Sequence, residues 1–105
     1  MMQDIFFNVA TPISFTVRET RNHWEIITTV KHTSMRGMEE EVQKTLQHPD
    51  EIRQSRRDFQ VYLFYREQRP KRWICAVVKR LNGEGFLITA YITEKVKEGN
   101  QIWKK

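Results

Sequence analysis

Residues 72–93 read RWICAVVKRLNGEGFLITAYIT, two apolar runs (72–80 and 85–93) on either side of a turn-forming Asn-Gly pair. Both runs are rich in β-branched and aromatic residues, which favours two β-strands. The run at 59–66, FQVYLFYR, has the same character and lies just before them. Short polar segments join the three runs, so the sequence predicts an antiparallel meander.

The register of the second hairpin follows from its apolar residues. A two-residue loop at Asn82-Gly83 would place Ala76 beside Thr89 and break the apolar row. We therefore expect a loop of three or five residues, which pairs Val78 with Ile88, Ala76 with Ala90 and Ile74 with Ile92. The opposite face then carries Lys79 beside Leu87, Val77 beside Thr89, Cys75 beside Tyr91 and Trp73 beside Thr93. We predict that this second face is the working surface.

The segments before the meander show two kinds of periodicity. Residues 13–18 alternate apolar with polar, and residues 24–31, WEIITTVK, are β-branched, so both are expected to be strands. From Ser34 the apolar residues recur at helical spacing, which predicts a helix capped by Thr33 or Ser34. Its core-facing stripe comprises Met35, Met38, Val42 and Leu46.

The remaining segments complete a single domain spanning residues 1–105. Residues 48–58, HPDEIRQSRRD, are expected to form a short second helix or a turn with Ile52 buried. Residues 1–11 are the expected loose end, so the ordered core should cover about 12–103.

Composition limits the class of protein. Hydrophobic residues make up 39% of the chain and charged residues 30%, which is typical of a compact globular domain. No apolar run approaches the ~20 residues of a membrane span and no signal peptide precedes the domain, so we expect a cytoplasmic protein without a membrane partner. The net charge of +5 favours a polyanionic partner.

The sequence lacks the residues that several kinds of catalysis need. His23, His32 and His48 are scattered and no acidic cluster of the Asp-x-Asp type is present, so no metal is expected. A phosphate-binding glycine loop and a Gly-x-Ser-x-Gly motif are both missing, so no nucleotide cofactor or serine-type acyl transfer is expected. Cys75 is the one cysteine and lies in an apolar run, which indicates a packing residue.

The remaining candidate site residues are basic and aromatic, and such side chains suit metal-independent cleavage of single-stranded RNA. That reaction needs a base for the ribose 2′-hydroxyl, cations for the phosphate and an acid for the departing 5′-oxygen. His32 is the expected acid or base, Arg56 and Lys79 the phosphate ligands, and Tyr65, Thr89 and Tyr91 the residues that orient RNA or the proton transfer. Further RNA contacts are expected from Arg36, Arg53, Arg57, Tyr62 and Trp73.

Each of these residues also has a plainer interpretation. His32 can simply end a strand and hydrogen-bond the backbone, and Thr89 can be a strand-forming residue. Tyr62 and Tyr65 can be sheet packing. Arg56 and Arg57 can be solvated charges or ion partners of Asp58.

Two longer strings carry a family resemblance. They are KHTSMRGMEEEVQKTLQHPDEIRQSRRDFQVYLFYR (31–66) and CAVVKRLNGEGFLITAYITEKVKEGNQIW (75–103). Together they resemble a family of small bacterial proteins, frequent in cyanobacteria, that is related to the barnase–EndoU–colicin–RelE superfamily of ribonuclease folds. Thr33 replaces the proline that usually follows the histidine, and Ile92 stands where that family often has a proline.

The resemblance implies an α+β fold with one or two helices packed on one face of a mainly antiparallel, RelE/barnase-like sheet. It also implies an endoribonuclease, the toxin of a type II toxin–antitoxin system, whose partners are RNA, including mRNA on the ribosome, and a cognate antitoxin. Superfamily members use different catalytic residues, so the resemblance does not assign roles to residues here.

Three functions therefore stay open at this stage. The first is the endoribonuclease, in which His32→Ala abolishes cleavage without unfolding the domain. The second is a non-catalytic RNA- or protein-binding module of the same fold, in which binding weakens with salt and RNA stays intact. The third is a docking protein whose exposed aromatic residues contact a partner.

Overall fold

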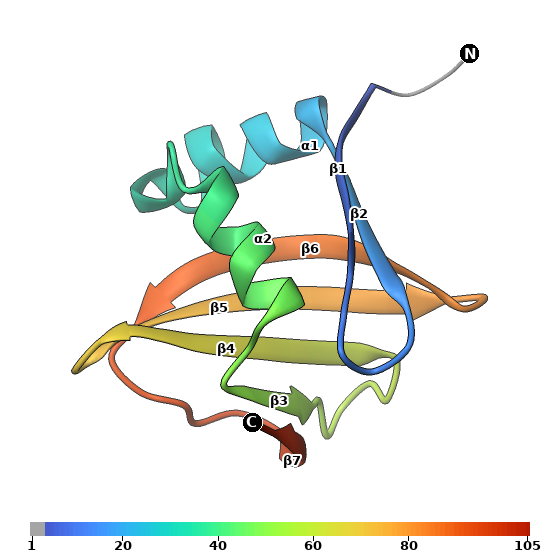
Figure 1. Ribbon diagram of the computed structural model, residues 1–105. Helices are drawn as coiled ribbons and strands as arrows, with labels where there is room; N and C mark the ends of the chain where they lie inside the picture. Colours follow the sequence, from blue (N-terminus) through green and yellow to red (C-terminus); the bar gives the residue numbers. More distant parts are fainter. Residues whose placement is uncertain (1–3) are drawn as a thin grey trace.

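The computed structural model describes residues 4–105 of the chain, which form an α+β fold around one seven-stranded mixed sheet. Its strands are β1 (Ile5–Ala10), β2 (Thr16–Thr20), β3 (Glu51–Gln54), β4 (Val61–Arg69), β5 (Arg72–Leu81), β6 (Glu84–Thr93) and β7 (Asn100–Lys104). They lie in the order β1-β2-β6-β5-β4-β3-β7, with β2 and β6 parallel and the other neighbours antiparallel. The sheet is strongly twisted, and the β1–β2 pair stands steeply across the meander strands (Figure 1).

The predicted meander of β4, β5 and β6 is confirmed, but the expected hairpin loop is wrong. Leu81 pairs with Glu84, so the loop has two residues, Asn82 and Gly83, whose φ angles are 53° and 82°. Positive φ at both positions is the geometry that an Asn-Gly turn favours between strands.

A bulge at Ile88 reconciles this short loop with the apolar row. Val77 pairs with Thr89 whereas Val78 pairs with Leu87, not with Ile88, so one extra residue is accommodated in β6. The predicted partners beyond the bulge are confirmed: Ile74 with Ile92, Ala76 with Ala90, Cys75 with Tyr91 and Trp73 with Thr93. Before the bulge, Lys79 lies beside Phe86, not Leu87.

The strand predicted at residues 24–31 is wrong, because this segment is helical. Helix α1 (Arg21–Ile26) continues into a π-helical turn, η1 (Ile27–Lys31). Thr20 caps α1 by accepting a hydrogen bond from the His23 backbone N–H at 3.2 Å. Trp24 and Ile27 are buried in the core, so helical packing outweighs the strand preference of the β-branched residues.

The core-facing stripe predicted for the next helix is confirmed at Val42 and Leu46, but the helix begins later than Ser34, so Met35 and Met38 precede it. A 3₁₀ turn, η2 (Thr33–Met35), comes first, and α2 spans Glu39–Gln47. Gly37 separates them with φ +80°, a conformation that an α-helix cannot contain. Thr33 and Ser34 therefore do not cap α2. Val42 and Leu46 are fully buried.

Two other expectations at the sheet edges are corrected. Residues 5–10 form β1 instead of a loose end, paired along its length with β2; residues 1–3 lie outside the described part. Residues 51–54 form β3, not a helix, because Ile52 is buried in the core and pairs with Phe64 of β4.

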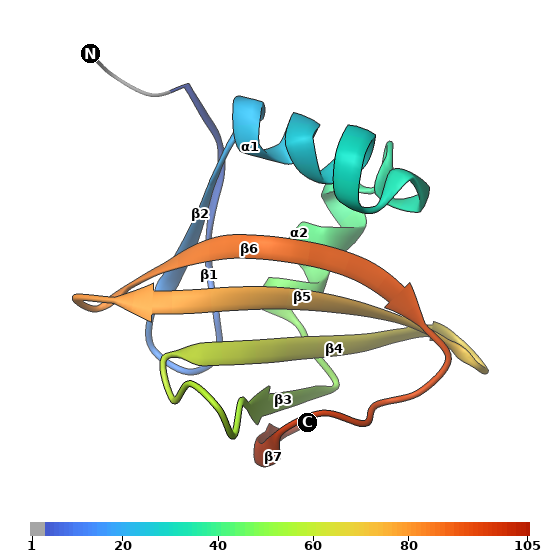
Figure 2. The ribbon, with the colours of Figure 1, turned by 180° about the vertical axis from the view of Figure 1, so that it is seen from behind.

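The two faces of the sheet differ in their covering. The main core lies on the face that carries α1 and α2 (Figure 1). No helix of the described chain covers the other face of the meander, which we call the open face (Figure 2). A small cluster of Leu63, Tyr65 and Cys75 is buried there. Within residues 4–105, no helix combines the length and apolar character of a membrane span.

Candidate functional site

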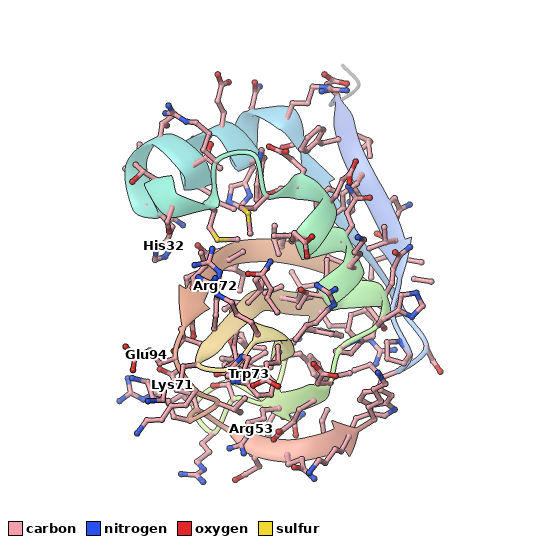
Figure 3. The ribbon with its side chains drawn as sticks, turned by 60° about the vertical axis from the view of Figure 1, so that its left-hand side comes forward. His32, Arg53, Lys71, Arg72, Trp73 and Glu94 are labelled. Carbon is pink, nitrogen blue, oxygen red and sulfur yellow. The ribbon has the colours of Figure 1, made fainter. Side chains whose placement is uncertain are left out.

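His32 is fixed at the edge of β6 by its backbone. Its N–H donates to the Ile27 carbonyl at 2.7 Å and its carbonyl accepts from the Met35 N–H at 3.0 Å. The residue thus links η1 to η2, and it ends a π-helical turn rather than the expected strand. Its ring lies 5.6 Å from the Tyr91 ring, centroid to centroid. Figure 3 shows His32 at the same end of the sheet as Lys71, Arg72 and Glu94.

A cavity of about 370 Å³ brings three predicted site residues together on the open face. His32, Thr89 and Tyr91 all line it, although His32 is distant from the other two in sequence. The rest of the lining comprises Ser55, Val61, Leu63, Val77 and Glu98. An apolar floor with polar groups at its border is the usual character of a ligand site.

A second cavity of about 430 Å³ adjoins the first and is basic. The two share Ser55, Leu63 and Glu98, so they form one continuous depression, which we call the open-face groove. The second cavity adds Arg56, Arg57, Lys97 and Gly99 to the lining. The groove therefore runs from His32 at the β6 edge to the arginines of the β3–β4 loop.

The hydroxyl of Thr89 has an unusual environment inside the groove. Its Oγ1 is buried and makes no hydrogen bond, and among residues 4–105 no other buried side-chain N or O atom lacks a partner. Such atoms are rare, because an unmade bond costs about 1–3 kcal/mol. A polar atom kept in this state next to a cavity is suited to a ligand that completes its hydrogen bond.

Tyr65, Cys75 and Tyr91 form a polar cluster beneath the groove. Burial raises the pKa of the Cys75 thiol to about 12, so the thiol stays protonated and unreactive. Burial, followed by the nearby Cys75, raises the pKa of both tyrosine hydroxyls well above their ordinary value. Tyr91 can therefore donate a hydrogen bond at neutral pH but cannot act as a base. Tyr65 is only 1% exposed, and Tyr91 packs against the buried cluster to which Tyr65 belongs.

Lys79 lies on the open face but is engaged by an acid. Its Nζ donates to Asp58 Oδ2 at 3.2 Å. A hydrogen bond from the Gln60 backbone, followed by this lysine, lowers the pKa of Asp58. Lys79 therefore holds the β3–β4 loop against β5, and it lines neither cavity of the groove.

Two of the other residues predicted to contact RNA, Arg53 and Tyr62, lie outside the open-face groove. Arg53 is held by Glu51 at 2.7 Å and by the Gly99 carbonyl at 3.1 Å, so it braces the β7 side of the sheet. Tyr62 packs against Phe15 on the helix-covered face, with ring centroids 5.6 Å apart, and cannot reach the groove.

Two further predicted contacts lie at the His32 end of the molecule. Trp73 lies at the start of β5 and packs against the small open-face cluster (Figure 3). Arg36 is exposed after η2. Neither residue lines the open-face groove.

The sequence did not predict three polar groove residues as site residues: Ser55, Lys97 and Glu98. Glu98 is the important omission, since it lines both cavities and adds a carboxylate to a basic site. Gly99 offered a signal. Its φ is +80°, and a Cβ there would lie 2.6 Å from the Gln54 carbonyl, so this glycine lets the β6–β7 segment approach β3.

No protein-family model, curated protein or solved structure matches the chain. Within the described residues, no three His, Cys, Asp or Glu side chains gather where they could hold a metal ion.

Proposed function

We propose that this protein is a metal-independent endoribonuclease that cleaves single-stranded RNA by attack of the ribose 2′-hydroxyl. The observation that carries the proposal is the open-face groove, in which His32, Thr89, Tyr91 and Glu98 share one cavity and Arg56, Arg57 and Lys97 line the next. This combination supplies a proton-transfer group, hydrogen-bond donors and cations along one path.

His32 and Glu98 divide the proton transfer. Glu98 accepts the proton of the 2′-hydroxyl, and O2′ forms a bond to phosphorus while the bond to the 5′-oxygen breaks. Protonated His32 supplies the proton that the departing 5′-oxygen takes up. The products are a 2′,3′-cyclic phosphate and a 5′-hydroxyl. Histidine suits this role because it exchanges protons near neutral pH.

The cations and hydroxyls stabilise the charge that grows on the phosphate. Arg57 and Lys97 line the basic cavity, and Arg56, whose Nε also donates to Asn100 at 2.9 Å, lies beside them. Guanidinium groups match phosphate oxygens with paired donors. Thr89 and protonated Tyr91 line the same cavity as His32 and would donate hydrogen bonds to RNA bound there.

A wider role as the toxin of a type II toxin–antitoxin pair is part of the same proposal. It rests on the resemblance of the sequence to the barnase–EndoU–colicin–RelE superfamily, and an α+β fold with one uncovered sheet face is consistent with it. In this role the protein acts in the cytoplasm on RNA, including mRNA on ribosomes, and binds an antitoxin.

The test uses end-labelled single-stranded RNA in EDTA, with native protein, Glu98→Gln and His32→Ala. The matched control is His48→Ala, which removes an exposed histidine at the end of α2. We expect native protein and the control to produce 2′,3′-cyclic phosphate ends, and the two groove variants to lose at least 100-fold in rate. All variants should keep the native melting temperature.

A second arm repeats the assay on translating ribosomes. Bound but intact RNA in both arms would contradict the nuclease and favour the non-catalytic binding module. That alternative is consistent with the ion pair of Lys79, because its ammonium group contacts Asp58 and is not free to hold a phosphate.

A further inference from the structure

The β3–β4 loop exposes an aromatic ring that the fold does not use. Phe59 is 71% exposed and belongs to neither buried cluster. The large exposed apolar side chains of residues 4–105 also include Ile26 and Val30, but Phe59 is the one aromatic residue among them. Exposing a phenylalanine forfeits the stabilisation that burial would give, so the ring is available for a ligand.

Several hydrogen bonds hold the loop that carries Phe59. Ser55 Oγ accepts from the Arg57 and Asp58 backbone N–H groups at 3.2 and 3.3 Å. The Phe59 carbonyl accepts from Gln54 Nε2 at 2.8 Å, and Lys79 anchors Asp58 from the neighbouring strand. The backbone on either side of the ring is therefore fixed, and a ligand does not bear the entropic cost of ordering it.

The surroundings of Phe59 specify the chemistry of the ligand. Arg56 and Arg57 precede it in the loop and line the basic cavity of the open-face groove, as does Lys97. Val61, two residues after Phe59, lines the cavity that holds His32. The Phe59 ring lines neither cavity, but it lies in the same loop as two arginines of the cationic groove. An exposed flat ring beside such cations fits a nucleobase attached to a phosphate backbone.

We propose that Phe59 is a stacking platform for an unpaired base of single-stranded RNA, next to phosphates held by Arg56 and Arg57. This inference rests on the proposed function and narrows its substrate class. Bases in a duplex are already stacked on one another, so the platform selects single strands, and it accepts any base because every base has a π-face.

The test measures binding of a fluorescent eight-nucleotide 2′-O-methyl RNA, which lacks the nucleophile and cannot be cut. Phe59→Ala should weaken binding roughly 5- to 150-fold, the range for the loss of one stacked base. It should leave the weaker binding of a duplex of the same strand unchanged. Phe59→Trp should keep native affinity and show quenching of the added tryptophan emission on binding.

The matched control is Val30→Ala, because Val30 is 75% exposed on η1 and lies outside the groove. It should bind RNA like the native protein. Equal single-strand affinity of Phe59→Ala and native protein would overturn the inference and leave the ring as a contact for a protein partner. An equal loss for duplex and single strand would also overturn it.

The failure of the proposed function gives a different result. If the 2′-O-methyl RNA binds in a Phe59-dependent way while native protein never cleaves RNA, the stacking platform stands and the nuclease does not. If native protein cleaves RNA and Phe59→Ala binds and cleaves normally, the nuclease stands and the platform does not. A native protein that binds no single-stranded RNA and cleaves none, either free or on translating ribosomes, refutes both.

Discussion

Replacing Thr89 by valine should stabilise the protein while impairing its function. Valine has nearly the same shape as threonine, so the change removes the unpartnered Oγ1 without opening a cavity. A buried hydroxyl without a partner costs about 1–3 kcal/mol, and we expect the free energy of unfolding to rise by an amount in that range. For a domain of this size, each kcal/mol corresponds to about 4–8 °C in melting temperature.

The assay is urea unfolding followed by tryptophan fluorescence, together with RNA cleavage. Thr45→Val is the control, because Thr45 is a buried threonine whose hydroxyl does have a partner, donating to the Glu41 carbonyl at 2.8 Å. The control should be no more stable than the native protein and should cleave RNA normally. Thr89→Val should be more stable and cleave RNA more slowly.

Two results would refute this reasoning at different steps. A Thr89→Val protein less stable than native would mean that the hydroxyl is satisfied in the folded chain. A variant that is more stable and cleaves at the native rate would mean that the groove does not use the hydroxyl.

Three further predictions concern stability. Gly85→Ala should lose about 1–3 kcal/mol in urea unfolding, because the added Cβ would lie 2.8 Å from Phe15 Cε1 where β2 meets β6; an unchanged urea midpoint would contradict this packing. Leu46→Ala should lose about 2–5 kcal/mol in the same assay, since Leu46 is fully buried, and a loss below 1 kcal/mol would show that α2 is not tightly packed. Glu41 accepts a hydrogen bond from Arg66 at 2.8 Å, and this bond lowers the pKa of Glu41 below its ordinary value of 4.5. Its contribution is therefore present above pH 4.5 and lost as the pH falls through the lowered pKa, so Glu41→Gln should make the acid branch of a stability–pH curve shallower. An identical acid branch would show that the ion pair does not contribute.

The meander and its apolar face were predictable because strand periodicity repeats over three adjacent runs. The segment at 24–31 was not, because a run of β-branched residues has a strong strand preference of its own. Trp24, Ile27 and Thr28 do follow helical spacing, but that signal is short. The Thr20 cap and the burial of Trp24 and Ile27 decide the outcome. The cap is a local interaction just before the segment, whereas the burial is a tertiary effect.

The candidate site was predictable only in part for a related reason. Thr89 and Tyr91 lie two residues apart on one strand, so their common face followed from alternation. Their proximity to His32 depends on the path of η1 and η2 past the β6 edge, which no local pattern encodes. Glu98 lines the groove because of the path of the β6–β7 segment. Tyr62 does not line it, because side chains alternate between the two faces along β4 and Tyr62 lies on the helix-covered face.

The bulge at Ile88 separates the hairpin tip from the residues that line the groove. Beyond it, Thr89 and Tyr91 are paired with Val77 and Cys75 independently of how the Asn82-Gly83 turn closes. A residue gained or lost at the tip can be absorbed by a change in the bulge. The tip is therefore the part of the meander where length variation and insertions should be tolerated without moving the groove.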